Sequence, residues 1–212
     1  MKDLAIYGAG GLGREIFCMI KNDRVANDKW NIIGFFDDNK DIGSCNEYGI
    51  ILGGLKEINS WCTDLDVAIA IGSGITVKKI VESINNPLIH FPNIICDTKF
   101  ADQHNFNIGN GNIIKNSSFS CNVSIGSFNL INNNVAFGHD CIVGNFNSFM
   151  PIVKISGEVS IGDCNFFGLG SLVLQQIRIQ NYTKLAAGSV LMIKRPKSGC
   201  LYIGNPAKVF TL

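Results

Sequence analysis

The sequence lacks the features that mark several broad classes of protein. Its formal net charge is only +1, whereas proteins that bind nucleic acid over a wide surface usually carry a marked basic excess. No apolar run reaches the ~18 residues of a membrane-spanning helix. Residues 1–13 contain glycines and an acid where a signal peptide has a continuous apolar core. We therefore expect a cytoplasmic protein that neither inserts into a membrane nor binds nucleic acid.

Patterns typical of metal sites are also missing. The eight cysteines include no CxxC pair, and no cysteine–histidine spacing resembles a zinc site, so we expect no metal. An even number of cysteines could form disulfides in a secreted chain, but the scatter and the missing signal peptide favour free, mostly buried thiols. Only Cys141 lies close to a histidine with a candidate role, His139.

The first 95 residues alternate between the periodicities of strands and helices. Apolar segments typical of strands lie at 4–8, 31–38 and 66–72. Segments with helical spacing lie at 13–22, 55–61 and 76–84. This alternation is typical of a parallel α/β layer. We predict a Rossmann-like domain over residues 1–95.

The remainder, residues 96–212, follows a period of six. Large apolar residues occupy fourteen successive positions of this period without a miss: Ile113, Phe119, Ile125, Ile131, Phe137, Val143, Phe149, Ile155, Ile161, Phe167, Val173, Ile179, Leu185 and Leu191. Four residues after many of them stands a small or β-branched side chain, and glycine often follows directly. A β-sandwich would instead show a period of two with hairpin turns.

A period of six predicts a left-handed parallel β-helix, in which three hexapeptides complete one triangular coil. The apolar residue fills the interior, and glycine or asparagine takes the tight corner. Such a solenoid requires capped ends. We expect the polar segment 105–111 and the tail after Arg195 to form these caps.

One histidine of the repeats has a position suited to chemistry. His139 falls at a corner, which points away from the packed interior, and could act as a general base near pH 7. A carboxylate such as Asp140 can fix an imidazole's tautomer, although adjacent residues need not face each other. His90 and His104, in a junction and an asparagine-rich loop, favour structural roles.

The glycines Gly8, Gly10, Gly11 and Gly13 follow a predicted strand and open a predicted helix. Such a turn brings backbone N–H groups and a helix N-terminus close to phosphate oxygens. Asp37 and Asp38 end the next strand, where acids can hold ribose hydroxyls. A domain of about 95 residues is too short to contain the two mononucleotide-binding units that NAD normally uses. A single nucleotide diphosphate is therefore the better fit. A turn that merely packs helix on strand remains an alternative.

Together these motifs resemble the sialic-acid O-acetyltransferase family. The chain is similar, more narrowly, to bacterial nucleotide-sugar N-acetyltransferases of the bacillosamine and perosamine pathways. The resemblance rests on the glycine turn, the strand ending in two aspartates, the AIG strand, the hexapeptide repeat with its His-Asp corner and the closing GNPAK. It covers nearly the whole chain. It implies acetyl-CoA as co-substrate, a nucleotide-linked amino sugar as acceptor and a homotrimer with active sites between neighbouring β-helices.

The resemblance also implies roles for individual residues. His139 matches the catalytic base, Asp140 the acid beside it, and Asn132 an asparagine of the same site. The substrate-binding region is matched by Gly8, Gly10, Gly13, Asp37, Asp38, Lys40, Gly72 and Ser73. The coenzyme-binding region is matched by Ser148, Gly157, Ala186, Ala187, Gly188, Pro206 and Lys208.

Two positions depart from the pattern of many relatives, which have histidines where this chain has Leu12 and Ser148. The first departure affects the contacts to the sugar nucleotide. The second suggests that Ser148 or a water replaces an imidazole beside the thioester. In the implied reaction His139 accepts a proton while the sugar amine attacks the thioester, and a backbone N–H such as that of Gly157 on the adjacent chain steadies the oxyanion.

Three hypotheses of function follow. The first is acetyl transfer to the amine of a nucleotide-linked 4-amino-4,6-dideoxy sugar, for bacterial surface glycan synthesis. The second is acetyl transfer to a hydroxyl, as on sialic acid, which would demand a better-activated base. The third is a non-catalytic nucleotide-sugar-binding or scaffold protein. The His139–Asp140 pair argues against the third, and the departures at Leu12 and Ser148 leave it open.

Overall fold

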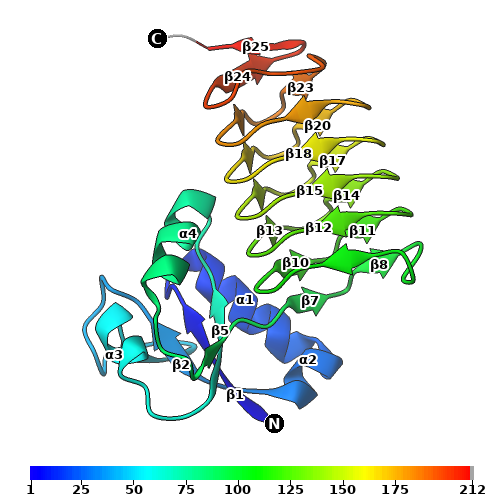
Figure 1. Ribbon diagram of the computed structural model, residues 1–212. Coiled ribbons are helices and arrows are strands. Elements are labelled where there is room, and N and C mark those ends of the chain that lie inside the picture. The colour runs from blue at the N-terminus through cyan, green and yellow to red at the C-terminus, as the bar shows by residue number, and fades with distance from the viewer. Residues whose placement is uncertain (211–212) are drawn as a thin grey trace. The chain divides into compact units, whose positions relative to one another are not determined.

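A computed structural model describes residues 1–210. These residues form two compact units, Met1–Cys96 and a second unit that begins at Asp97. The boundary predicted from the sequence falls after residue 95. The first unit is an α/β layer, and the second is a β-solenoid made of stacked coils (Figure 1).

The first unit is built on a sheet with the strand order β3-β4-β2-β1-β5-β6. Its pairs are parallel apart from the antiparallel hairpin β3–β4. The elements are β1 (Lys2–Tyr7), α1 (Gly11–Asn22), α2 (Arg24–Lys29), β2 (Trp30–Phe36), β3 (Cys45–Asn46), β4 (Gly49–Gly53), α3 (Leu55–Asn59), β5 (Leu65–Ile69), α4 (Gly74–Ser83), β6 (Ile89–His90) and β7 (Ile94–Cys96). Strand β2 pairs with one side of β1 and β5 pairs with its other side, so the strand order reverses at β1. Open α/β sheets bind ligands at such a reversal.

Each strand and helix predicted for this half is present, with ends shifted by a few residues. Strand β5 is buried along its whole length, as expected for a parallel strand covered on both faces. Helix α2 and the hairpin β3–β4 were not predicted. Helix α2 has only six residues and begins where the Asp23 carboxylate accepts the N–H of Ala26 at 2.9 Å, a local cap that leaves little periodic signal.

The second unit repeats every 18 residues. Phe119 pairs with Phe137, and Phe137 pairs with Ile155, so one coil contains three hexapeptides (137 − 119 = 18). The pairs form three parallel faces, called here face I, which includes β24-β22-β19-β16-β13-β10, face II, β23-β20-β17-β14-β11-β8, and face III, β21-β18-β15-β12-β9. The antiparallel strand β25 closes the C-terminal end of face I.

The strands of the solenoid are short. Face I contains β10 (Ile113–Lys115), β13 (Leu130–Ile131), β16 (Ser148–Phe149), β19 (Phe166–Phe167), β22 (Lys184–Leu185) and β24 (Leu201–Gly204), followed by β25 (Ala207–Val209). Face II contains β8 (Lys99–Phe100), β11 (Ser118–Phe119), β14 (Ala136–Phe137), β17 (Lys154–Ile155), β20 (Leu172–Val173) and β23 (Val190–Leu191). Face III contains β9 (Asn107–Ile108), β12 (Ser124–Ile125), β15 (Ile142–Val143), β18 (Ser160–Ile161) and β21 (Arg178–Ile179).

The interior of the solenoid confirms the period of six. All fourteen apolar positions, from Ile113 to Leu191, are at most 4% exposed. Equivalent rings in successive coils stack, as Phe119 does on Phe137 at 5.2 Å between centroids. Burying each large side chain contributes roughly 1.5–3 kcal/mol. The core of this unit is therefore one continuous apolar column.

The corners are built differently from the prediction. A positive φ recurs every six residues, but asparagine or glycine occupies only some of these positions, and Phe128, Phe146 and Ile152 occupy others. The glycines that directly follow the interior apolar residues are required for close packing between coils and not for a positive φ. A Cβ on Gly138 would lie 2.5 Å from the backbone nitrogen of Gly157, so close stacking of the coils excludes a side chain there.

Buried asparagines form a ladder along the corner that leads into face I. The side-chain oxygen of Asn129 accepts the backbone N–H of Asn147 at 2.9 Å, and the side chain of Asn147 does the same for Asn165. Each of these residues is at most 1% exposed. The ladder satisfies backbone groups that the tight corner would otherwise leave buried without a partner.

Candidate functional sites

The glycine turn of the first unit lies between β1 and α1, at the carboxyl edge of the sheet. A Cβ on Gly13 would lie 1.9 Å from the carbonyl oxygen of Gly8, so α1 packs directly on the turn. Gly8 itself has φ +110°, and a Cβ there would lie 2.7 Å from the carbonyl oxygen of Ala70. Gly10, in contrast, faces open space. The turn therefore combines two packing glycines with one position that a ligand can approach.

Helix α1 offers an N-terminus that no side chain caps. Its N-cap is Gly10, and its first turn contains no acidic residue. The N–H groups there combine with the helix dipole to favour a negatively charged group. This geometry supports the phosphate-binding prediction for the turn.

Asp37 and Asp38 lie beside this turn, but both carboxylates already have partners in the chain. Asp37 accepts the N–H of Ala9 at 2.9 Å and that of Asn39 at 3.0 Å. Asp38 accepts the N–H of Leu55 at 2.8 Å and the hydroxyl of Tyr7. The two acids thus hold the glycine turn and the start of α3 in place, in addition to any ligand that they bind.

The remaining residues predicted for this site lie at the same edge. Gly72 is exposed and faces open space, and Ser73 caps α4 by accepting the N–H of Thr76 at 3.4 Å. Lys40 is exposed in the loop after β2. The ends of three parallel strands, β1, β2 and β5, therefore bring these predicted residues to one edge of the sheet.

In the second unit, His139 and Asp140 form a hydrogen-bonded pair at the corner between β14 and β15. The ring Nδ1 lies 2.7 Å from the carboxylate Oδ2 of Asp140. The hydrogen bonds from His139 and then from Asn122 hold the pKa of Asp140 below its usual range, so this carboxylate is ionised and can only accept. Nδ1 must therefore carry the proton, which leaves the lone pair of Nε2 open to accept one.

The imidazole of His139 lies against Gly157, which occupies the equivalent position one coil later (157 − 139 = 18). A Cβ on Gly157 would lie 2.6 Å from Nε2. The side chain of His139 is 54% exposed, so its ring can reach a bound substrate. A glycine at 157 thus provides the space that the ring occupies.

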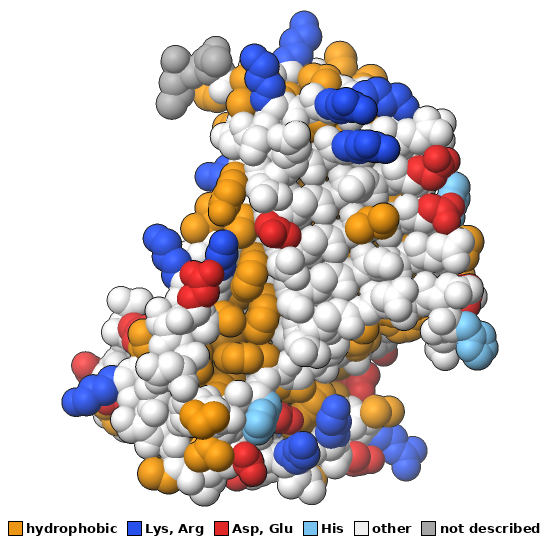
Figure 2. Space-filling model, viewed as in Figure 1, with side chains coloured by type: hydrophobic (Ala, Val, Ile, Leu, Met, Phe, Trp, Pro, Cys, Tyr) orange, Lys and Arg blue, Asp and Glu red, His pale blue; other side chains and the backbone are white. Residues whose placement is uncertain are grey.

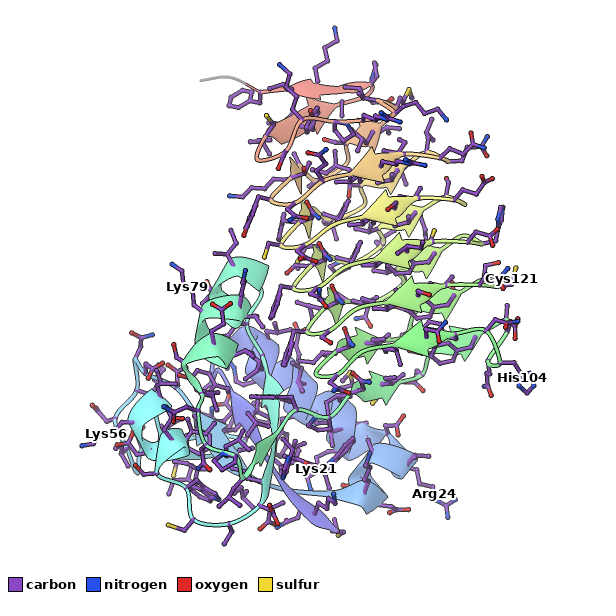
Figure 3. All side chains as sticks on the ribbon, in the orientation of Figure 1. Lys21, Arg24, Lys56, Lys79, His104 and Cys121 are labelled. Carbon is purple, nitrogen blue, oxygen red and sulfur yellow. The ribbon has the colours of Figure 1, made fainter. Side chains whose placement is uncertain are left out.

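Asn122 is a member of this site that the sequence did not reveal. Its side-chain nitrogen donates to Oδ1 of Asp140 at 2.9 Å, from one coil earlier (140 − 122 = 18). Cys121 precedes it at the position equivalent to His139, and Figure 3 shows its side chain directed outward from the corner. Reading the sequence at a period of 18 would have identified both positions.

The predicted coenzyme residues lie on another corner. Ala186, Ala187 and Gly188 form the corner between β22 and β23, and the closing hairpin lies over it, since Gly204 N–H donates to Ser189 Oγ at 3.0 Å. Pro206 and Lys208 are exposed in this hairpin. Within one chain these residues are therefore on a different edge of the solenoid from His139.

Two further predicted residues are also separate from His139 within one chain. Asn132 lies at the corner between β13 and β14, where its side chain accepts the N–H of Asn133 at 2.7 Å. Ser148, in β16 on face I, is only 1% exposed. Their roles at a site with His139 stay predictions that require a neighbouring copy.

The other histidines and the cysteines have structural surroundings. His90 lies 3.3 Å from Asp64, and His104 is exposed between β8 and β9, two coils before His139 at the same corner of the solenoid. Figure 3 shows His104 at the outer end of this coil. All eight cysteines are free, but only three are buried, fewer than predicted. Cys141 is one of these three, and burial raises the pKa of its thiol, which donates to Ser156 O at 3.1 Å. Cys141 is therefore part of the packed interior.

In the described part of the chain, no group of three or more histidine, cysteine, aspartate or glutamate side chains could hold a metal ion. Over the same residues, no helix is long and apolar enough to cross a bilayer.

Comparison with known proteins identifies the first unit and the fold. Residues 3–84 match the family model of the PglD N-terminal domain. The acetyltransferase domain of PglB from Neisseria gonorrhoeae FA1090 is 24% identical, with a TM-score of 0.87 over 99% of this chain and 100% of that one, and a second structure of it contains acetyl coenzyme A. WeeI from Acinetobacter baumannii AYE is 23% identical, with a TM-score of 0.87 over 99% of this chain and 100% of that one.

A variant of the perosamine N-acetyltransferase from Caulobacter crescentus, with a histidine replaced by asparagine, is 19% identical. Its TM-score is 0.87 over 100% of this chain and 98% of that one, and its structure contains CoA and GDP-perosamine. The resemblance predicted from the sequence agrees with these findings: residues 3–84 match the PglD N-terminal domain, and the chain shares its fold with the PglB acetyltransferase domain and with the perosamine N-acetyltransferase.

Proposed function

We propose that the chain is an acetyl-CoA-dependent N-acetyltransferase for the 4-amino group of a nucleotide-linked 4-amino-4,6-dideoxy sugar. The observation that carries the proposal is the His139–Asp140 pair, at 2.7 Å, with Nε2 free to accept a proton. It occurs in a chain with the fold of proteins whose structures contain acetyl-CoA, or CoA with GDP-perosamine. The product would serve bacterial surface glycan synthesis.

In the proposed step the sugar nitrogen attacks the carbonyl carbon of the thioester. The new N–C bond forms, the C–S bond breaks, and coenzyme A leaves as its thiol. His139 accepts the proton that the amine loses, and the ionised Asp140 stabilises the resulting imidazolium. The N–H of Gly157 donates to no acceptor among residues 1–210, and Gly157 lies against the ring of His139, so we place the oxyanion donor in the same chain as His139 and not in the adjacent chain.

The proposed assembly is a homotrimer. One chain places His139 on the corner between faces II and III and the Ala186–Gly188 segment on the corner between faces I and II. A site that uses both segments requires the His139 corner of one copy to face the Ala186–Gly188 corner of its neighbour. The coenzyme would lie between these two corners. Gly157 and the Ala186–Gly188 segment are at these corners and could contact it, whereas Ser148 is buried and could not.

The proposed acceptor site combines the glycine turn with the ends of β2 and β5. The N-terminus of α1 would bind the diphosphate, since it has free N–H groups and Gly10 leaves room for close approach. Asp37, Asp38 and Lys40 lie where the ribose and base would follow.

The test measures thiol release from acetyl-CoA with a panel of UDP-, dTDP- and GDP-linked 4-amino sugars and with free sialic acid. We expect release with a 4-amino sugar, and loss of at least about 10²-fold in turnover for His139→Ala with unchanged assembly by light scattering. His104→Ala is the matched control, because this histidine is exposed at the same corner two coils earlier and makes no hydrogen bond to Asp140. Release only with sialic acid would indicate the O-acetyltransferase, and no release with any acceptor would refute transferase activity.

A further inference from the structure

Five polar side chains form a column at the corner of the solenoid that carries His139. They stand 18 residues apart in successive coils, namely Asn122, Asp140, Glu158, Gln176 and Lys194. All five residues are exposed. The first four share a positive φ between 56° and 61°, so their backbones repeat the same turn. The column therefore presents one polar side chain per coil along a single edge of the solenoid.

Hydrogen bonds connect this column except at one gap. On the N-terminal side of the gap, the side-chain nitrogen of Asn122 donates to Asp140 at 2.9 Å. On the C-terminal side, Nε2 of Gln176 donates to the two carboxylate oxygens of Glu158 at 3.3 and 3.4 Å, and Nζ of Lys194 donates to Oε1 of Gln176 at 3.2 Å. Among residues 1–210, no hydrogen bond joins Asp140 to Glu158. The gap thus lies between the two acids of the column.

The gap coincides with the candidate reaction centre. The ring of His139 bonds to Asp140 at 2.7 Å, and the backbone oxygen of His139 accepts the N–H of Glu158 at 2.8 Å. Gly157, which precedes Glu158, lies against Nε2 of the ring. Neighbouring coils are about 4.8 Å apart, the spacing of paired strands. The imidazole therefore lies against both coils from which the two carboxylates project.

The described chain supplies no lysine or arginine to neutralise this gap. Asp140 forms an ion pair only with His139, and Glu158 forms none, among residues 1–210. The side chain of Gln176 separates Lys194 from Glu158. Figure 2 shows acidic and histidine side chains together at one edge of the solenoid, apart from the Lys and Arg side chains nearer its C-terminal end. Two carboxylates one coil apart attract a cation to the space between them.

We propose that Glu158 acts together with Asp140 to bind the acceptor amine in its ammonium form, an inference that rests on the proposed function. Aliphatic amines have pKa values above neutrality, so the acceptor arrives as an ammonium ion with three N–H donors. A sugar hydroxyl carries no charge and gains little from a second carboxylate. Glu158 therefore selects an amine over a hydroxyl as the acceptor.

The proton balance of the proposed step is unchanged by this role. The ammonium ion releases one proton to water before its nitrogen attacks the thioester. His139 then accepts the second proton as the N–C bond forms and coenzyme A leaves. The imidazolium that results lies beside the same two carboxylates, so the site that binds the cationic substrate also stabilises the cationic form of the base.

The test compares Glu158→Gln with the wild-type protein, using the nucleotide-linked 4-amino sugar that gives thiol release and its analogue with a hydroxyl at C4. By calorimetry we expect the Kd for the amino sugar to rise about tenfold in the variant, as for loss of one charged contact. The Kd for the hydroxyl analogue should not change. In turnover, KM for the amino sugar should rise by more than kcat falls. Glu82→Gln is the matched control, since it removes the same charge from the exposed end of α4.

A measurement on the wild-type protein alone gives a second readout. Added salt should weaken its binding of the amino sugar more than its binding of the hydroxyl analogue, because salt screens exposed charges. Equal salt dependence for the two ligands would contradict the inference, as would a change in Glu158→Gln that is the same for both. Either result would leave the proposed function intact provided that the wild type releases thiol. If it released none with any amino sugar, the proposed function would be wrong and the inference with it.

Discussion

The contact between His139 and Gly157 makes a methyl group at position 157 an informative perturbation. In Gly157→Ala the new Cβ would lie 2.6 Å from Nε2 and 2.7 Å from Cε1 of the imidazole. An ordinary contact begins at about 3.4 Å, so the ring has to move by roughly 0.8 Å. The atoms that must move belong to a side chain that is 54% exposed, so the ring can turn outward while the coils keep their stacking.

A displacement of this size has a large effect on catalysis and a small one on stability. A misplacement of about 1 Å typically costs 10²-fold in rate, and we expect a loss of this order in kcat for Gly157→Ala. The free energy of unfolding should change by less than about 1 kcal/mol, because no backbone atom is displaced. Gly138→Ala gives the contrast: its Cβ would lie 2.5 Å from the backbone nitrogen of Gly157 and should destabilise the solenoid.

The assay is steady-state thiol release from acetyl-CoA, combined with a double-variant cycle. If alanine at 157 acts through the ring of His139, it should have almost no further effect in the His139→Ala background. A similar loss in both backgrounds would refute this reasoning and would indicate that the methyl blocks the coenzyme instead. A rise in the KM for acetyl-CoA without a fall in kcat would refute it in the same way.

Three other variants test single features of the solenoid. Asn122→Ala removes one of the two bonds to Asp140, so the pKa of Asp140 should rise toward its usual value in an NMR titration, and kcat should fall several-fold. An unchanged titration would argue against a positioning role. Asn147→Ala leaves the buried N–H of Asn165 without its acceptor and should cost about 1–3 kcal/mol in chemical denaturation. Ile152→Asn should stabilise the fold by about 1 kcal/mol, read as a higher Tm, because a β-branched residue at φ +68° is strained and asparagine tolerates this region.

The period of six predicted the solenoid well because it reflects a physical constraint that repeats. Each interior position must be filled, so an apolar residue at Ile113 implies one at Phe119 and at every later step, and all fourteen are buried. The corners carry a weaker constraint. A left-handed residue is required at each, but strain of about 1–2 kcal/mol is tolerated, so Phe128 and Ile152 can stand where asparagine was expected.

The pattern of the first unit predicted its main elements but not all of their roles. Asp37 and Asp38 were predicted to hold a ligand because they end a strand. The structure shows that their carboxylates also hold Ala9 and Leu55, contacts between segments far apart in sequence. Hairpin β3–β4 was missed since its strands have two and five residues, too few for a clear alternation.

The His139 site is a product of the solenoid's vertical repeat. Position 122 of one coil supplies a donor to Asp140, and position 157 of the next coil supplies space for the ring, each 18 residues from its partner. Neither residue is close to His139 in the sequence, and neither is of a type that suggests catalysis. Because three stacked coils contribute, the pair depends on the alignment of the coils as well as on its own two side chains. In the proposed function a single histidine therefore makes a polar column at one corner the reaction centre, provided that position 157 in the next coil carries no side chain.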